Sequence, residues 1–283
     1  MSNLSLQLLN KDDILAMHRQ TLWVFENVGC RVGSKEIRSV LRKAGANVDD
    51  ATETVRFPAK MVEELISLAP DTVTHQELSG RVHRSNTRNR IYGAILLDPN
   101  VVDYHDGRRA PVLEDVRRHT ILAQSLPHVS ILMRMQQSIS DIPGPDGYLA
   151  TMETYISHHN KHLHLMPTDM DNCNLWLELI DMLRDHYGWE DKAPVATIAV
   201  AVTSPLQLHD INCRLLQTAV NRGFPFTTTV CPMAGATSPY TVAGTALLAN
   251  VDALLPVLIA QVLKPGHPCY YTIAPSVMDM RSG

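Results

Sequence analysis

Apolar residues recur at helical spacing along the first third of the chain. Leu15, Leu22 and Phe25 share one face of a stretch that ends at Asn27-Val28-Gly29, as in an amphipathic helix. The helices predicted in this way are 12–28, 34–44 (with Ser34 as N-cap) and 58–68, and residues 54–57 fit a short strand. The pattern therefore predicts an N-terminal helical accessory region over residues 1–88.

From residue 89 the pattern changes to strand-like apolar runs that alternate with helices. The predicted strands are 91–97, 131–139, 162–166, 197–202, 226–230 and 268–273. The predicted helices are 113–125, 148–157, 174–186, 206–221 (with Ser204 as N-cap) and 240–263. Short connections between such units are typical of a parallel sheet covered by helices. Units of this size fit either a (β/α)₈ barrel or a doubly wound sheet.

The number of predicted strands is too small for a closed barrel. Six strands follow residue 88, whereas a TIM-type barrel needs eight. We therefore expect an α/β fold with a TIM-type (β/α) barrel over residues 89–283 that is incomplete at its C-terminal end. An open edge exposes backbone groups and apolar helix faces, so the domain needs a partner, a swapped segment or rearranged N-terminal pieces to cover it. We also expect a homo-oligomer. Alternatively, two short strands within 54–83 join the sheet.

Composition narrows the class of protein. With 283 residues, 45% of them hydrophobic, the chain can bury a substantial core. A net charge of −4 without a basic stripe argues against a nucleic-acid partner. The five cysteines include no C-x-x-C pair, which indicates a reducing compartment rather than a disulfide framework or structural zinc. Because no signal-peptide pattern or uninterrupted apolar span is present, we expect a cytoplasmic protein with no membrane partner.

Residues 231–244 are the most informative stretch of the sequence. They lie between a strand-like run and a long apolar helix, and their small residues allow a ligand to approach the backbone. Ser238 and Pro239 have the form of an N-cap and a first helical residue. Unpaired N–H groups at such a helix start can bind an anion or a carbonyl group. The residues predicted to bind substrate here are Gly235, Ala236 and Thr237.

The literal sequence of this stretch, with several others, resembles one family. Residues 231–244 read Cys-Pro-Met-Ala-Gly-Ala-Thr-Ser-Pro-Tyr-Thr-Val-Ala-Gly. Further segments are Asn-Val-Asp-Ala-Leu at 250–254, Lys-Pro-Gly-His-Pro at 264–268 and Asp-Met-Arg-Ser-Gly at 279–283, with Tyr92-Gly93 and Asn160-Lys161-His162 upstream. Together they resemble the corrinoid-dependent trimethylamine methyltransferase family, which includes glycine betaine methyltransferases. Family members continue past the position of Gly283, so the resemblance implies a C-terminally truncated member.

The resemblance implies an enzyme that moves a methyl group from a quaternary or tertiary amine to the Co(I) corrinoid of a partner protein. The corrinoid supplies the nucleophile, so the chain has only to bind, orient and dehydrate the amine. This agrees with a sequence that shows no Ser/His/Asp or Cys/His arrangement, and it leaves the catalytic residues unassigned. Trimethylamine-specific members carry pyrrolysine in a region past Gly283. Since no pyrrolysine is seen, a glycine betaine-like substrate is favoured.

Aromatic and charged side chains are the groups that such a substrate needs. A quaternary ammonium ion cannot donate a hydrogen bond and is held by aromatic faces and carboxylates. A betaine carboxylate needs cations or N–H groups. The aromatic candidates on or near predicted strands are Tyr92, Tyr104, Tyr155, Tyr270 and Tyr271, and the candidates for the carboxylate are Arg134, Lys161, Arg281 and the loop 234–237. Of the side chains among them, Tyr92, Tyr104, Tyr155 and Tyr271 are the predicted contacts of the ammonium group, and Arg134 and Arg281 those of the carboxylate. Each tyrosine taken alone also fits ordinary packing.

Two histidines at strand spacing, His162 and His164, are expected to point to the same face of their strand. Such a pair could bind zinc, but no cysteine or carboxylate ligand stands beside it. A helix end with cationic side chains that runs into a strand is the simpler interpretation. We therefore predict no metal site and retain His162 as a substrate-binding candidate.

Other cofactor signatures are missing, since the sequence has no G-x-G-x-x-G after a strand and no Walker loop. Asp-Tyr-His-Asp-Gly at 103–107 is similar to the D-x-H-x-x-G corrinoid-binding motif, but its glycine comes one place early, so we interpret it as a turn. We expect no directly bound cofactor and a corrinoid presented by a partner protein. Two alternatives remain: a non-catalytic interaction module of the same family, and an unrelated TIM-barrel enzyme that binds phosphate at loop 234–239.

Overall fold

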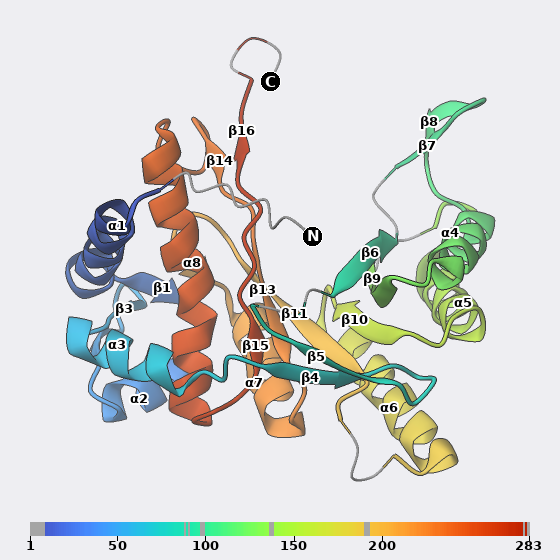
Figure 1. Ribbon diagram of the computed structural model, residues 1–283, viewed down its shortest axis with the longest axis horizontal. Coiled ribbons are helices and arrows are strands. Elements are labelled where there is room, and N and C mark those ends of the chain that lie inside the picture. The colour runs from blue at the N-terminus through green and yellow to red at the C-terminus, as the bar shows by residue number, and fades with distance from the viewer. Residues whose placement is uncertain are drawn as a thin grey trace, which may run out of the picture.

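The computed structural model describes residues 9–279 except 88, 90, 97–99, 136–138 and 190–192, together with residue 281; the side chains of Leu96, Arg134 and Met135 lie outside the described part. Figure 1 shows an N-terminal region beside helix α8, and a curved sheet with further helices around it. One continuous core of buried apolar side chains joins the two regions. The expected domain boundary near residue 88 stays a prediction.

The N-terminal region contains a small sheet in addition to its helices. Its elements are α1 (Lys11–Trp23), the π-helical turn η1 (Val24–Val28), β1 (Cys30–Val32), α2 (Lys35–Lys43), β2 (Asn47–Asp49), β3 (Thr54–Arg56) and α3 (Ala59–Leu68). The sheet has the order β12-β1-β3-β2, and its strand β12 (Gln207–Leu208) comes from the barrel portion. Ser34 caps α2 as predicted, because its hydroxyl accepts the Ile37 N–H at 3.4 Å.

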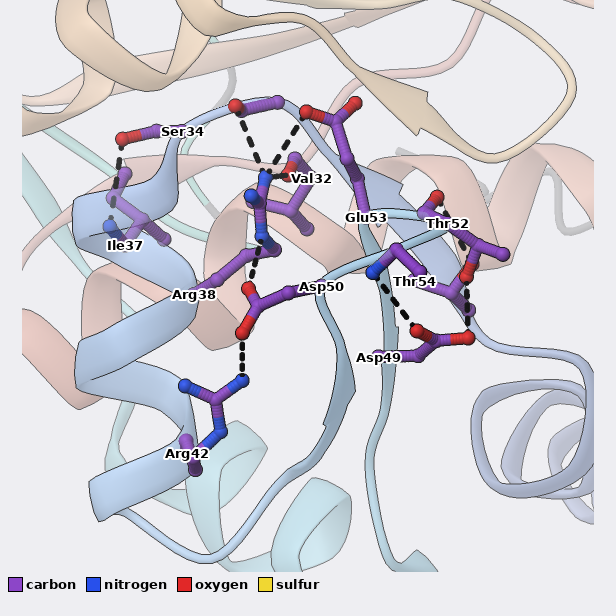
Figure 2. A network of polar contacts seen from close by, with 12 residues as sticks. Val32, Ser34, Ile37, Arg38, Arg42, Asp49, Asp50, Thr52, Glu53 and Thr54 are labelled. Atoms are coloured by element: carbon purple, nitrogen blue, oxygen red, sulfur yellow. Dashed lines mark hydrogen bonds and ion pairs between the residues drawn. The ribbon is translucent and has the colours of Figure 1, made fainter.

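Arg38 connects the elements of this region. Its buried guanidinium donates to the backbone oxygens of Val32 at 2.7 Å and Gly33 at 3.1 Å. It also donates to the carboxylates of Asp50 at 3.0 Å and Glu53 at 3.3 Å, as Figure 2 shows. A buried charge is tolerated when it is paired and hydrogen-bonded in this way. The network fixes β1, α2 and the turn between β2 and β3 relative to one another.

In the described part of the chain, six parallel strands form the main sheet, which is a half-barrel and not a closed barrel. Its strands are β6 (Tyr92–Leu96), β9 (Val129–Met135), β10 (His162–Met166), β11 (Ala196–Val202), β13 (Phe226–Val230) and β15 (Cys269–Tyr270). The helices between them are α4 (Leu113–Ser125), α5 (Gly144–Ser157), α6 (Met170–Tyr187), α7 (Asp210–Arg222) and α8 (Val242–Leu263). Neighbouring strands follow chain order and every pair is parallel. The predicted alternation of six strands with helices is therefore confirmed.

Helix α8 lies between the N-terminal region and the sheet, where it packs on α1, α3 and β13. Residues 251–261 are all buried. A helix that is apolar on all sides is typical of the core of a large domain. By length and composition alone α8 could cross a membrane, but it is mostly buried inside the molecule and contains Asp252 and Pro256.

Two helices begin later than predicted. The predicted helix 206–221 begins only at Asp210, and the Ser204 hydroxyl donates to Asp252 Oδ2 at 2.6 Å instead of capping it. Helix α8 begins at Val242, and its N-cap is Thr241. The hydroxyls of Ser238 and Thr245 bond each other at 3.0 Å. Ser204 bonds a residue far away in the sequence, whereas Ser238 bonds a side chain in the first turn of α8 while Thr241 caps that helix, so the two N-cap predictions are wrong.

Three short pairs of strands lie outside the main sheet. They are β4 (Val73–Gln76) with β5 (Val82–Ser85), β7 (Val101–Asp103) with β8 (Gly107–Arg109), and β14 (Met233–Ala234) with β16 (Ser276–Val277). The alternative in which strands within 54–83 join the main sheet is wrong, because β4 and β5 pair with each other and β3 belongs to the N-terminal sheet. The segment 103–107 is the turn between β7 and β8, as predicted.

Candidate functional site

The concave face of the half-barrel holds a cleft of about 550 Å³. Side chains alternate between the two faces of a strand, so every second residue of a strand points into the cleft. The strands contribute Ile95, Ile131, Met133, Met166, Thr227 and Thr229, together with His164 on β10. Among the described residues that line the cleft, none carries a formal charge at neutral pH. The wall therefore offers methyl-sized apolar contacts, hydroxyl groups and one imidazole.

The amino end of the sheet is covered by the β4–β5 hairpin, which crosses it in Figure 1. The Gln76 N–H donates to the Pro194 oxygen at 2.8 Å, just before β11. The Ser79 N–H donates to the Asn160 oxygen at 2.8 Å, just before β10. These backbone bonds hold the hairpin against the starts of two adjacent strands.

His162, the first residue of β10, is part of this closure. It is fully buried. Its Nδ1 lies 2.9 Å from the backbone oxygen of Gln76, and its Nε2 lies 2.8 Å from Thr197 Oγ1. The His75 ring packs against it at a tilt, with 4.5 Å between the ring centroids, and His75 Nδ1 bonds the Tyr270 hydroxyl at 2.9 Å. Burial lowers the pKa of His75 to about 4 and holds the pKa of His162 well below its usual value. Both ring nitrogens of His162 thus have protein partners, which fits a structural role, and the substrate contact stays a prediction.

His164, two residues further along β10, differs from His162 in its hydrogen bonds. It is 3% exposed and lines the cleft, and its Nε2 has no hydrogen-bond partner in the described part of the chain. Burial lowers the pKa of His164 to about 4, so the imidazole is neutral at pH 7. A buried polar atom without a partner is uncommon and costly in folded proteins. His164 therefore lines the cleft with a neutral imidazole whose buried Nε2 the described chain leaves without a partner.

The loop that follows β13 does not offer its amides to a ligand. The N–H groups of Ala236, Thr237 and Ser238 all lie 3.0–3.1 Å from the Met233 oxygen. Gly235 donates to the Ser238 oxygen at 3.2 Å, and the Met233 N–H donates to Thr237 Oγ1 at 2.9 Å. The predicted anion-binding role of Gly235, Ala236 and Thr237 thus has no free donor in this conformation. The phosphate-binding alternative loses its structural basis for the same reason.

Asp252 holds another loop at the carboxyl end of the sheet. Its carboxylate is fully buried in α8 and accepts the Ser204 hydroxyl at 2.6 Å and the Leu206 N–H at 2.8 Å. Burial raises the pKa of Asp252 to about 6, against the opposing effect of these two hydrogen bonds. The carboxylate thereby ties the segment after β11 to α8.

The structure does not bring the predicted tyrosines to the cleft. Tyr92 is 58% exposed at the start of β6, and Tyr104 is 95% exposed on the β7–β8 turn. Tyr155 is fully buried on α5, where its hydroxyl donates to the Leu132 oxygen at 2.5 Å and its ring packs edge-on against Trp176. The side chain thus belongs to the packing between α5, α6 and β9, and its substrate-binding role stays a prediction.

The remaining predicted residues are also scattered. The Tyr271 hydroxyl donates to Asn250 Oδ1 on α8 at 2.7 Å, and it is the neighbouring Tyr270 that reaches the cleft. Arg281 is exposed near the end of the chain. The side chain of Arg134 lies outside the described residues, although its backbone pairs with Leu165 in the sheet. No set of cations or aromatic rings around one point emerges from these positions.

Most of the residues that line the cleft are not among the predicted substrate-binding residues. Met133, Met166, Thr227 and Thr229 carry no motif and look like ordinary strand residues. The signal that could have found them is the alternation along each predicted strand, above all the Thr-Thr-Thr run at 227–229, where hydroxyls are unusual for a buried strand. Only the pairing register decides which alternate residues face inward.

Metal and corrinoid sites receive no support from side-chain geometry. No group of three or more His, Cys, Asp or Glu residues that could hold a metal ion occurs in the part of the chain that the structure describes. In the segment 103–107, Asp103 Oδ1 accepts the N–H groups of His105 at 2.8 Å and Asp106 at 3.2 Å. These residues sit on a hairpin that projects away from the main sheet in Figure 1, so they do not fit an enclosed corrinoid site.

The comparisons with known proteins agree on one family. The model of the trimethylamine methyltransferase (MTTB) family matches residues 2–283. The chain is 25% identical to trimethylamine methyltransferase MttB of Methanosarcina thermophila over 305 residues, covering all of this chain and 60% of that protein. It is 23% identical to glycine betaine methyltransferase of Desulfitobacterium hafniense (strain Y51), covering 98% of this chain and 57% of that protein. The chain thus spans about three-fifths of the length of these curated relatives.

A solved structure shows the same fold at low sequence identity. The crystal structure of the hydroxylamine MtmB complex superposes with a TM-score of 0.53 and 9% identity, covering 95% of this chain and 60% of that chain. Fold, motif segments and family model agree along nearly the whole sequence. The chain belongs to the trimethylamine methyltransferase (MTTB) family.

Proposed function

We propose that this chain forms the amine-binding part of a methyltransferase that moves a methyl group from a small tertiary or quaternary amine to the Co(I) corrinoid of a partner protein. The observation that carries the proposal is the uncharged cleft on the concave face of the half-barrel, in a chain that matches the family from residue 2 to residue 283. The names of the relatives, trimethylamine and glycine betaine methyltransferases, support an amine with several methyl groups.

The proposed methyl transfer needs little chemical participation from the side chains of this protein. The C–N bond breaks with its electron pair going to nitrogen, and the corrinoid cobalt supplies the pair that forms the new Co–C bond. A positively charged nitrogen leaves as a neutral amine, so no general acid has to act on it. Binding, orientation and exclusion of water are then the contributions of the protein. The methyl-sized apolar contacts of Ile131, Met133 and Met166 suit that task.

We further propose that the six strands are part of a TIM-type barrel whose remaining strands come from elsewhere, and that the protein works in the cytoplasm as a homo-oligomer. The solved neighbour supports the fold, and the exposed edge strand β6, with Ile95 62% exposed, supports a covering partner. The corrinoid is proposed to be carried by the partner protein, with no cofactor bound directly to this chain.

A second candidate is a non-catalytic interaction module of the same family. The open half-barrel favours it, because β6 and β15 end the described sheet without a further strand to pair with. Such a module would retain the corrinoid protein without turning over an amine.

The test is methyl transfer to a reduced corrinoid protein, followed by the absorbance change from Co(I) to methyl-Co(III). Trimethylamine, glycine betaine and carnitine are each offered to this chain, and to a version extended by any residues encoded after Gly283; the corrinoid protein alone is the control. Transfer by this chain supports the proposal for the chain as it stands. Transfer only by the extended version supports the amine-binding part of a longer enzyme. No transfer from any amine, with retention of the corrinoid protein on immobilised chain, favours the interaction module.

A further inference from the structure

Tyr270 is the tyrosine that the fold brings to the cleft. It is the second residue of β15 and pairs with Thr227 of the neighbouring parallel strand β13. Residues paired side by side in a sheet point to the same face of it. Thr227 and Tyr270 both line the cleft, and Tyr270 is only half-buried. The side chain of Tyr270 therefore points to the concave face of the half-barrel, and part of it stays accessible.

The hydroxyl of Tyr270 is anchored at the amino end of the sheet. It lies 2.9 Å from Nδ1 of the fully buried His75, and the two rings meet at 63° with 6.4 Å between their centroids. The His75 ring is stacked in turn on His83 at 5.2 Å, and His83 Nε2 lies 2.7 Å from Glu77 Oε1. These contacts limit the rotation of the Tyr270 side chain. Because the hydroxyl is engaged, the aromatic ring is what Tyr270 can offer to a ligand in the cleft.

The ring lies in a wall that has no carboxylate among its described residues. Burial lowers the pKa of His164 to about 4, so its imidazole is neutral at pH 7, and burial raises the pKa of Tyr270, so its ring is a neutral phenol. Apart from His164, Tyr270 supplies the only aromatic ring of the described wall. The faces of aromatic rings are partially negative and attract cations, including ammonium ions that have no N–H group.

We propose that the ring of Tyr270 is the specificity-determining contact for a small ammonium ion, and that His75 is the positioning residue that holds this ring. The inference rests on the proposed function and deepens it, because it names the substrate class as an amine that binds in its positively charged form. An uncharged molecule of the same shape would keep the apolar contacts with Ile131 and Met133 and would lose the attraction to the ring.

The same contact separates substrate from product. When the methyl group leaves, the electron pair of the C–N bond stays on nitrogen, so the ammonium ion becomes a neutral amine. The attraction between the positive charge and the ring of Tyr270 is thereby lost. We expect the cleft to hold the charged substrate more tightly than the uncharged product.

The test is direct binding of two matched ligands at pH 7.5, without any corrinoid protein. Choline carries a trimethylammonium group, and 3,3-dimethyl-1-butanol has the same shape with an uncharged carbon in place of nitrogen. Both are titrated by calorimetry into the wild-type chain, Y270L, Y270F and Y240L. We expect Y270L to bind choline about tenfold more weakly and the alcohol less than about twofold more weakly. Y270F keeps an aromatic ring, so choline binding should weaken by less than about threefold. Tyr240 is 73% exposed and is not among the residues that line the cleft, so Y240L should change neither ligand.

A spectroscopic readout on the wild-type chain does not depend on the folding of Y270L. In protein deuterated everywhere except at tyrosine, the N-methyl protons of choline should show nuclear Overhauser effects to tyrosine ring protons. Y270F, which has no tyrosine protons at this position, should lose them.

The outcomes separate the inference from the proposed function. Equal weakening of both ligands in Y270L, unchanged choline binding, no Overhauser effect or no choline binding to the wild type overturns the inference. Methyl transfer that Y270L leaves unchanged removes the inference and keeps the proposed function. Choline binding that depends on Tyr270, without methyl transfer from any amine, removes the proposed function and keeps the inference.

Discussion

The two ends of the half-barrel treat buried polar groups differently. At the amino end, His162 has a partner for each ring nitrogen, and His75 shares one hydrogen bond with Tyr270. Two residues further along the same face of the same strand, His164 Nε2 has none in the described chain. At the carboxyl end, Asp252 is buried with two neutral donors and a raised pKa. The difference lies in these particular side chains, because His75 Nε2 and the side-chain amide of Gln76 at the amino end also lack partners in the described chain.

This difference corresponds to a division between stability and function. In (β/α) barrels the amino face is generally associated with stability and the carboxyl face with ligand binding. An unpartnered buried polar atom costs about 1–3 kcal/mol, a cost that a ligand can offset when it supplies the missing bond. We therefore expect substitutions at the closed end to lower the free energy of unfolding more than substitutions at the open side. Substitutions at the open side should have the larger effect on ligand binding.

The largest expected effect is a contrast between two histidines. H162A leaves the Gln76 oxygen and the Thr197 hydroxyl without their partner in a fully buried position, and it opens a cavity, so we expect a loss of about 4 kcal/mol. H164A removes an atom with no protein partner beside an existing cleft, so we expect a loss below about 1 kcal/mol. Urea unfolding of both variants at pH 7 measures the difference. Equal losses would show that the two ends of the barrel are not distinct.

The next effect concerns the buried carboxylate at the carboxyl end. The pKa of Asp252 is raised in the folded state to about 6, so folding favours the protonated form. Its contribution to stability is complete below the unfolded pKa near 4 and is lost as the pH rises through 6. In D252N the amide can accept the Leu206 N–H and donate to the Ser204 oxygen without a buried charge. We expect D252N to be more stable than the wild type at pH 8, by at most about 3 kcal/mol.

The difference between D252N and the wild type should narrow between pH 6 and pH 4, which urea unfolding at pH 8, 6 and 4 can follow. D210N changes an exposed aspartate and is the control, since we expect no comparable pH-dependent difference. A D252N variant that is less stable at every pH would mean that the charged form of Asp252 is favourable in the fold.

The amino end should also respond to acid, in the opposite direction. The pKa of His75 is lowered to about 4 in the folded state, so its contribution to stability is present above the unfolded value near 6.5 and is lost as the pH falls toward 4. H75F removes this group. We expect the loss of stability between pH 7 and pH 5 to be about 2 kcal/mol smaller in H75F than in the wild type. An identical pH dependence of the two proteins would exclude His75 as a cause of acid sensitivity.

Much of the barrel portion could be predicted because its signals are local. The strands 162–166 and 226–230 and the helix 113–125 have the predicted bounds, since apolar runs and capping residues define them without help from distant residues. The starts of α7 and α8 could not be predicted, because Ser204 bonds the distant Asp252 and because Ser238 bonds the Thr245 hydroxyl while Thr241 is the N-cap of α8. The β4–β5 hairpin was missed because its strands are short and partly polar.

The site was harder to predict than the fold, because function there depends on what each side chain meets in space. Tyr155 and Tyr104 have the same chemistry, yet one is buried between helix and sheet and the other is 95% exposed. His162 and His164 share a strand face but differ in their hydrogen bonds. The backbone oxygen of Gln76, on the β4–β5 hairpin, bonds His162, whereas His164 Nε2 has no partner in the described chain. Family motifs locate the loop 231–244, but its amide groups turn out to bond the loop itself.

The smallest contrast is between two neighbouring tyrosines. The Tyr270 hydroxyl bonds His75 Nδ1 at 2.9 Å inside the closed end, and Y270F leaves His75 with both ring nitrogens unpartnered, which should cost about 1 kcal/mol. The Tyr271 hydroxyl bonds Asn250 at a site where the side chain is 44% exposed, so water can replace the bond and Y271F should cost less than about 0.5 kcal/mol. Thermal unfolding of both variants tests the ranking. A larger cost for Y271F would mean that the contact between α8 and the residue after β15 matters more, and it would weaken the view that the closed end carries the stability.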